Sequence, residues 1–130
     1  MNSEEVKAFY RRYIDCLNRR QLDKLNQFVN QKFTYNSRVI SLYDYQEMLN
    51  QNIIDIPDLY FAIELLIPAE NQVASRLIFD CTPVGEFMGI GIFGKKVIFT
   101  EHVFYELQKG KINKVWSVID KDAIRAQVRG

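Results

Sequence analysis

The chain has few of the residues that carry metal, redox or polyanion chemistry. Its 130 residues include one histidine, two cysteines and three prolines, and the formal net charge is +1. Cys16 and Cys81 match no metal-ligand or redox spacing, so we expect two reduced, partly buried thiols in a cytoplasmic protein. A net charge so close to zero supplies no overall field for a polyanion, which argues against nucleic-acid binding.

Long apolar runs are absent as well. No stretch approaches 18 apolar residues, and the first ten residues contain no apolar signal segment, so we expect neither export nor membrane insertion. The only basic cluster comprises Lys7, Arg11, Arg12, Arg19 and Arg20. Because acidic residues are interspersed with these side chains, the cluster indicates a solvated helix face better than a nucleic-acid patch.

Aromatic residues, by contrast, are abundant, with nine Phe, seven Tyr and one Trp. A hydrophobic fraction of 48% and a charged fraction of 25% are usual for a globular domain, and this length allows one real core. Bulky rings suit a wide, irregular interior. A ligand cavity and a plain packed core are equally consistent with them.

The first half of the chain has helical periodicity. The spacing of apolar residues predicts an amphipathic helix capped by Ser3 and a short second helix around residues 22–29. A third helix begins near Ser41 and ends before Pro57, because the residue before a proline disfavours the helical region.

After Pro57 the period changes to that of strands. Alternation predicts strands at 59–67, 73–82, 96–107 and 112–119, followed by a terminal helix at 121–128. The first hairpin sets Glu64 opposite Arg76 as a cross-strand ion pair. Helices followed by strands, with no linker or repeat between them, predict one α+β domain over residues 1–130.

The second half of the chain also carries a family resemblance. It rests on the stretch TPVGEFMGI at 82–90, then on Gly94, Lys95, Gly110, Lys111, Ile112, Trp116 and Asp120. Together with the order of elements, these residues resemble the SnoaL-like polyketide cyclases of the nuclear-transport-factor-two-like superfamily. The resemblance implies a cone-shaped, curved mixed or antiparallel sheet wrapped around N-terminal helices, a cystatin-like α+β barrel. It also implies a homodimer formed through the convex face of the sheet.

The resemblance identifies a candidate acid/base, because it puts Asp120 at the position of the cyclases' proton-transferring carboxylate. Two departures from the family pattern bear on the substrate. Pro83 stands where many relatives have histidine, and Glu106 stands where they have arginine. The fold hosts cyclases, isomerases, hydrolases and binding proteins, so the family alone does not fix the chemistry.

The register of the last hairpin determines which side chains share a face with Asp120. A three-residue loop at 108–110 with a left-handed glycine pairs residue 102 with residue 116. One face of the sheet then carries His102, Phe104, Trp116, Val118 and Asp120. A two-residue loop would instead move His102 to the opposite face, because a slip of one residue inverts the pattern.

These residues suggest cofactor-independent proton transfer next to a carbonyl, as in an intramolecular aldol closure. In an apolar cavity, burial favours the neutral form of the Asp120 carboxyl, which can then accept and return a proton, with His102 orienting it or donating to the enolate oxygen. The expected ligand is a small hydrophobic or carbonyl-containing molecule. Its predicted contacts are Tyr10, Tyr13, Tyr35, Phe87, Met88 and Trp116. No metal or nucleotide is expected, since neither ligand spacing nor a phosphate-binding glycine motif is present.

Each of these assignments has a simpler alternative. Asp120 is equally suited to capping the helix that begins at Lys121. His102 can instead be exposed, or buried with its hydrogen bonds satisfied. The aromatic residues can simply belong to the packed core. The competing function is a non-catalytic domain that binds a small hydrophobic ligand or a partner protein. An exposed, helix-capping Asp120 favours that alternative, whereas a buried carboxylate that faces a cavity favours the enzyme.

Overall fold

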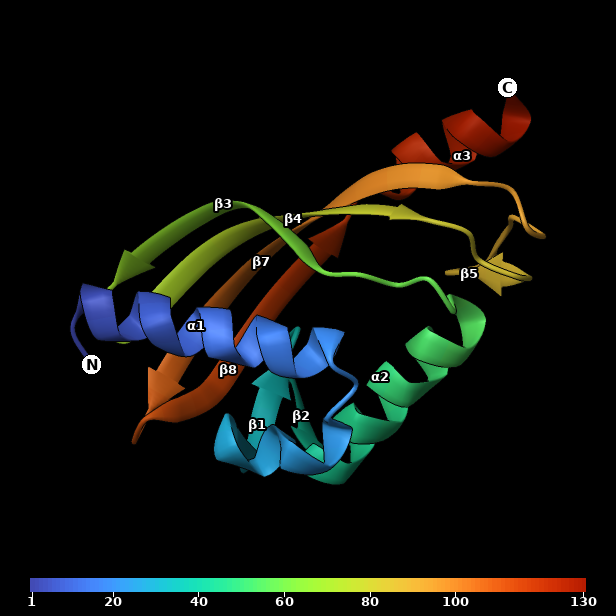
Figure 1. The fold of residues 1–130 in the computed structure, drawn as a ribbon. Helices are drawn as coiled ribbons and strands as arrows, with labels where there is room; N and C mark the ends of the chain where they lie inside the picture. Colours follow the sequence, from blue (N-terminus) through green and yellow to red (C-terminus); the bar gives the residue numbers. More distant parts are fainter.

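A curved six-stranded sheet surrounds the first helix in the computed structural model, which describes residues 1–130 (Figure 1). The strands are ordered β2-β1-β8-β7-β4-β3, and all neighbours are antiparallel except β1 and β8. Their bounds are Val29–Tyr35 (β1), Arg38–Ser41 (β2), Ala62–Ala69 (β3), Gln72–Cys81 (β4), Val97–Gln108 (β7) and Lys111–Ile119 (β8). The short strands β5 (Glu86–Phe87) and β6 (Ile90–Gly91) form a separate hairpin. The predicted α+β class with a curved, mostly antiparallel sheet is confirmed.

The three helices occupy different sides of this sheet. Helix α1 (Ser3–Asn18) lies along the concave side, α2 (Leu42–Asp55) lies beside one end of it, and α3 (Lys121–Arg129) lies on the outer side of β7 (Figure 1). The inner face of α1 buries Val6, Phe9, Tyr10, Tyr13 and Leu17. The concave side of the sheet and the helices therefore share one aromatic core.

The N-cap of α1 differs from the predicted one. Asn2, not Ser3, caps α1: its side chain accepts a hydrogen bond from the Glu5 amide at 2.9 Å, and the Glu5 carboxylate accepts one from the Asn2 amide at 3.1 Å. Ser3 is already helical, so it lacks the extended backbone of a cap. Ser41 caps α2, accepting from the Asp44 amide at 3.0 Å, so this helix begins where the sequence predicted.

The predicted second helix is shorter than expected, and two strands after it were not predicted. Leu22–Gln27 forms a single 3-10 helix (η1), and Val29 already starts β1. Strand β1 buries Val29 and Phe33 among polar residues, which leaves a weak alternation signal. Asn36 and Ser37 then turn the chain into β2 with φ values of 47° and 69°, the geometry of a tight two-residue hairpin turn.

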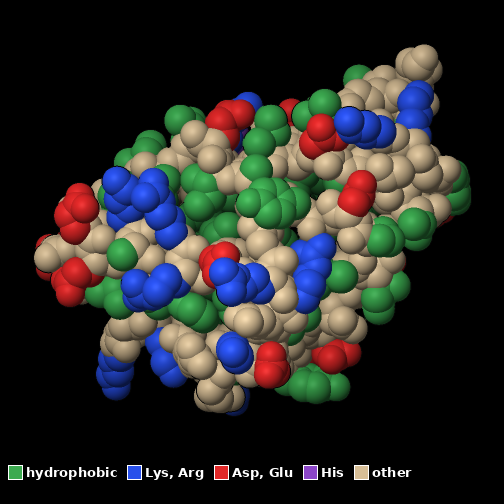
Figure 2. Space-filling model, in the orientation of Figure 1, with side chains coloured by type: hydrophobic (Ala, Val, Ile, Leu, Met, Phe, Trp, Pro, Cys, Tyr) green, Lys and Arg blue, Asp and Glu red, His purple; other side chains and the backbone are tan.

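The basic cluster lies on the solvent side of α1 and just beyond it, as predicted. Figure 2 shows Lys and Arg side chains spread over this face with Asp and Glu among them. One ion pair there joins Arg19 to Asp15 at 2.9 Å. The thiols of Cys16 and Cys81 are both buried and free. None of the helices combines the length and the apolarity needed to cross a membrane.

A bulge in β3 decides which of its apolar residues face outward. The pairing with β4 shifts between Ile63 and Leu65, so that Glu64 is the extra residue and Leu65 is paired with Arg76. The predicted ion pair forms nevertheless, with Arg76 Nε 2.6 Å from Glu64 Oε1. Beyond the bulge, Leu65 and Ile67 are exposed on the outer face of the sheet.

Candidate functional site

The last hairpin has a two-residue loop, so the predicted three-residue loop is wrong. Lys109 and Gly110 both have positive φ, 54° and 76°, and Gln108 pairs with Lys111. A bulge then shifts the register, so that Glu106 pairs with Lys114 and Phe104 with Trp116. The bulge restores the side-chain parity that the shorter loop would have inverted. His102, Phe104, Trp116 and Val118 therefore share one face as predicted, but it is the outer face of the sheet.

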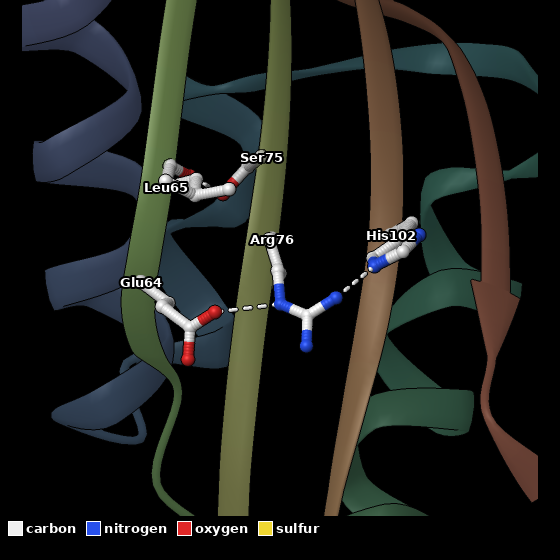
Figure 3. A network of polar contacts seen from close by, with 5 residues as sticks. All are labelled: Glu64, Leu65, Ser75, Arg76 and His102. Carbon is white, nitrogen blue, oxygen red and sulfur yellow. Dashed lines mark hydrogen bonds and ion pairs between the residues drawn. The ribbon is translucent and has the colours of Figure 1, made fainter.

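His102 consequently lies outside the cone. Its side chain lies beside Arg76 of the neighbouring strand, with Arg76 Nη1 2.7 Å from His102 Nε2, and Glu64 contacts the other side of the same guanidinium (Figure 3). An arginine can only donate, so Nε2 accepts and a neutral His102 carries its proton on Nδ1. The predicted position of His102 beside a cavity carboxylate is wrong, because even-numbered residues of β7 point outward.

Asp120 also lies outside the cone, contrary to its predicted place in an apolar cavity. Strand β8 ends at Ile119, and the exposed Asp120 carboxylate accepts a hydrogen bond from the Ala123 amide at 3.1 Å, which makes it the N-cap of α3. Asp120 and His102 do line the same groove, with Arg76, Asp122 and Arg125. That groove is open, charged and on the surface.

Three of the six predicted ligand contacts, Met88, Trp116 and Tyr10, do not line the cavity inside the cone. Met88 is at the tip of the β5–β6 hairpin with a positive φ of 53°, and it is exposed. Trp116 is 39% exposed on the outer face of β8. Tyr10 is fully buried, but its ring packs against Tyr13 and Tyr105 without lining a cavity.

The other three, Tyr13, Tyr35 and Phe87, do line a cavity inside the cone. Its volume is about 70 Å³, so it is small beside the several hundred cubic ångströms of typical ligand pockets. Aromatic and aliphatic side chains form nearly all of its wall, and Asn52 and Glu101 are the only other residues there. Further lining residues include Tyr45, Met48, Phe61, Phe79, Phe99, Val103 and Tyr105.

Glu101 is the cavity's carboxylate, and the sequence interpretation missed it. It occupies an odd-numbered, inward position of β7 between Phe99 and Val103, which are both buried. Burial raises the pKa of the Glu101 carboxyl above its usual range, and the Ser117 hydroxyl, which donates a hydrogen bond to Oε2, partly offsets that rise. A signal existed: one acid interrupts the apolar series Val97, Phe99, Val103, Tyr105 and Leu107.

Tyrosine hydroxyls supply further polar atoms of the cavity, beside Asn52 and Glu101. Tyr13 from α1 and Tyr45 from α2 are hydrogen-bonded to each other through their hydroxyl groups. Burial is the main cause that raises the pKa of Tyr13, Tyr35, Tyr45 and Tyr105, so these hydroxyls stay protonated at neutral pH. The site therefore combines one weakly acidic carboxyl with several neutral hydrogen-bond donors.

The two departures from the family pattern do not remove a group from this cavity. Pro83 is buried in the segment before β5, and Glu106 pairs with Lys114; neither lines the cavity. No three His, Cys, Asp or Glu side chains lie close enough to bind a metal ion together. The arrangement is suited to acid/base chemistry in a low-dielectric pocket.

Comparison with known proteins identifies the family. A family model described as SnoaL-like polyketide cyclase matches residues 7–128. The chain belongs to the SnoaL-like polyketide cyclase family. The crystal structure of a SnoaL-like polyketide cyclase from Agrobacterium tumefaciens strain C58 is 43% identical, covers 92% of this chain and 94% of that chain, and superposes with a TM-score of 0.90.

More distant solved structures share the fold. AclR from Streptomyces galilaeus, a candidate hydroxylase, is 22% identical with a TM-score of 0.79, covering 98% of this chain and 97% of its own. IdmH from Streptomyces antibioticus, a candidate polyketide cyclase, is 16% identical with a TM-score of 0.81, covering 95% and 97%. Comparison with curated protein sequences finds no significant match. Proteins with different assigned chemistries thus share this fold, so the reaction has to be inferred from the residues of this cavity.

Proposed function

We propose that this chain is a cofactor-independent acid/base enzyme that moves a proton next to the carbonyl group of a small, neutral ligand. Glu101 takes and returns the proton. The observation that supports this proposal is a single carboxylate on the wall of a cavity lined mainly by aromatic and aliphatic side chains. Asp120 has no part in it, because its carboxylate caps α3 outside the cone.

The proposed chemistry is an intramolecular aldol reaction. A Glu101 oxygen removes a proton from the carbon next to a carbonyl, and the C–H electron pair moves to form the enolate. The enolate carbon attacks a second carbonyl carbon of the same molecule, which forms a carbon–carbon bond and an alkoxide. The alkoxide takes the proton back from Glu101, so atoms and charge balance. A raised carboxyl pKa brings the base closer to the working pH, where proton transfer is most efficient.

The lining of the cavity restricts the class of ligand. No Lys, Arg or His lines it, so a negatively charged ligand would meet Glu101 with no compensating cation. A volume of about 70 Å³ admits only a few heavy atoms, and a ring-closing substrate requires side chains such as Met48 and Phe87 to move. A neutral ketone is therefore the simplest ligand that fits.

The half-reaction provides the test. In heavy water, wild-type protein is expected to accelerate exchange of the methyl protons of acetone for deuterium, as followed by proton NMR. Glu101→Gln, which keeps shape and removes the base, is expected to reduce that rate by about 100- to 10,000-fold. Asp120→Asn is the matched control and is expected to leave it unchanged. Cyclisation of heptane-2,6-dione tests the carbon–carbon bond-forming step in the same variants.

A non-catalytic pocket for a small hydrophobic ligand is the second candidate, and the small volume of the cavity favours it. The two functions differ in the same experiment. Acetone that binds wild-type protein without exchanging its protons faster than in buffer would support the binding function and exclude the enzyme.

We further propose that the outer face of the sheet pairs with a second copy of the chain. Five exposed apolar residues from β3, β7 and β8 support this, and they line one continuous groove: Leu65, Ile67, Phe104, Trp116 and Val118. A contiguous exposed apolar patch is typical of an interaction surface, and a two-fold axis lets one patch cover its own copy. Sedimentation velocity is expected to give a dimer for wild type and a monomer for Phe104→Glu. Val39→Glu, which changes an exposed residue of β2, is expected to stay dimeric.

A further inference from the structure

The hydroxyl pair of Tyr13 and Tyr45 is a polar feature of the cavity that the proposed proton transfer does not use. Tyr13 comes from α1 and Tyr45 from α2, and both side chains line the cavity that Glu101 enters from β7. The two side chains are almost completely buried, with exposed fractions of 0% and 5%. Their hydroxyl groups bond to each other, and the Tyr105 hydroxyl is a second, weaker partner of Tyr13.

The number of donors in this pair exceeds the number of its acceptors. Two hydroxyl groups carry two hydrogens, and the bond between them uses one. No close protein acceptor takes the second hydrogen, although it lies in an apolar interior where an unpaired donor is unfavourable. Because burial raises the pKa of both groups, neither loses its proton at neutral pH. One donor therefore remains available to whatever occupies the cavity.

The position of the pair relative to Glu101 suits a ligand that contacts both. The negative charge of Glu101 is among the causes that raise the pKa of Tyr45, so the two groups lie within electrostatic reach. They approach from a helix and from the sheet, so a small molecule between them can meet the base on one side and a donor on the other. A hydroxyl that accepts a hydrogen bond also becomes a stronger donor, because hydrogen bonds in a chain polarise one another.

We propose that the free hydrogen of the Tyr13–Tyr45 pair binds the carbonyl oxygen of the ligand and stabilises the oxyanion that forms when Glu101 removes the neighbouring proton. This inference rests on the proposed function for its catalytic part, but carbonyl binding itself needs no proton transfer. The pair donates to an oxygen whose negative charge grows in the transition state, so its bond strengthens as the reaction proceeds.

Removing both hydroxyls at once gives the clearest test. A single Tyr→Phe change leaves the other hydroxyl free to donate, whereas Tyr13→Phe with Tyr45→Phe removes the donor and its partner together and leaves no unsatisfied group. Tyr10→Phe is the matched control, because the Tyr10 hydroxyl is buried without a partner and does not line the cavity. Tyr35→Phe and Tyr105→Phe test the two other hydroxyls of the cavity wall.

The probe is acetone labelled with carbon-13 at its carbonyl carbon, whose resonance moves downfield when the oxygen accepts a hydrogen bond. Binding is measured independently by saturation transfer from protein to the methyl groups. Wild type, Tyr10→Phe and Glu101→Gln are expected to show a saturable downfield shift. The double variant is expected to lose most of that shift while acetone still binds. Its rate of proton exchange, where wild type shows exchange, is expected to fall by about 100- to 1,000-fold, as when an oxyanion donor is removed.

The outcomes separate this inference from the proposed function. A carbonyl shift that depends on the tyrosine pair, with no proton exchange in wild type, would retain the binding site and exclude the acid/base enzyme. A shift that persists in the double variant, or that is lost in Tyr35→Phe or Tyr105→Phe instead, would overturn the inference. Absence of acetone binding to wild type would overturn it too, because the pair would then present no donor to a ketone.

Discussion

The two faces of β7 and β8 differ in chemistry although their residues alternate along the same strands. Glu101 points into the cone, where Ser117 contacts it among aromatic rings. His102, one residue later, points outward to Arg76 in a groove open to solvent. A shift of one position along a strand thus separates a carboxyl whose pKa is raised by burial from a surface polar network.

The same contrast applies to the two carboxylates that compete for the catalytic role. Asp120 has backbone amide groups and solvent around it, and its hydrogen bond stabilises a helix. Glu101 has one hydroxyl partner and an apolar cavity. A carboxylate that caps a helix N-terminus is engaged in a structural hydrogen bond, whereas a carboxyl in an apolar pocket is the one that can exchange its proton. Position in the fold, rather than residue type, distinguishes the two acids.

Substitution of two phenylalanines of β7, one on each face of the sheet, is expected to give the largest difference in the free energy of unfolding. Phe99 is 3% exposed and stacks on Phe79 at a centroid distance of 5.1 Å, whereas Phe104 is 55% exposed on the outer face. We expect Phe99→Ala to reduce the free energy of unfolding by about 3–5 kcal/mol, through lost burial and a new cavity. Phe104→Ala is expected to cost less than about 1 kcal/mol in the monomer, because little burial is lost. Urea unfolding at low protein concentration measures both, and equal losses would contradict the assignment of the two faces.

A pH-dependent stability difference is expected for the inner carboxyl. A carboxyl whose pKa is raised by folding stabilises the protein fully below its ordinary value of 4.5, and the contribution is lost as the pH rises through the folded pKa. As the pH rises from 4.5 through the folded pKa of Glu101, wild type is therefore expected to lose stability relative to Glu101→Gln. The loss in the free energy of unfolding is about 1.4 kcal/mol for each tenfold change that folding makes in the acid dissociation constant of Glu101.

Ser117→Ala sharpens this prediction. The Ser117 hydroxyl donates to the charged carboxylate and lowers its pKa, so its removal is expected to extend the loss of stability to higher pH. Urea unfolding of the three proteins between pH 4 and pH 8 measures the effect. Parallel pH profiles for wild type and Glu101→Gln would show that Glu101 is not buried in solution.

The sequence predicted the elements with strong periodicity and missed those that depend on local exceptions. Helix α2, the long strands β4 and β7, and α3 lie where the pattern indicated. Strand β1 was missed because only Val29 and Phe33 anchor it in the core. The bulge that follows Ile112 has no signature in composition, yet it sets which residues of β8 share a face with His102.

The candidate site was predicted in part, for the same physical reason. Tyr13, Tyr35 and Phe87 belong to apolar patterns that point inward, and they line the cavity. His102 and Trp116 share one face of the sheet, and His102 and Asp120 line one groove, but alternation alone does not say which face of a sheet is concave. Glu101 was recognisable as the one acidic residue among the otherwise apolar, inward-facing positions of β7. The pairing of Tyr13 with Tyr45 depends on how α1 and α2 meet, which no local pattern records.

The smallest expected effect concerns the outer carboxylate, and it tests the assignment of Asp120 most directly. Asp120→Ala removes the side-chain oxygen that accepts from the Ala123 amide, so we expect a loss of about 1 kcal/mol in the free energy of unfolding. Asp120→Asn keeps an equally good capping oxygen, so its expected loss is about half that or less. Both variants are expected to keep wild-type exchange of acetone protons. If Asp120→Asn instead lost that activity while remaining folded, the cavity carboxyl would not suffice for the chemistry, because a group on the outer side of the sheet would then take part in it.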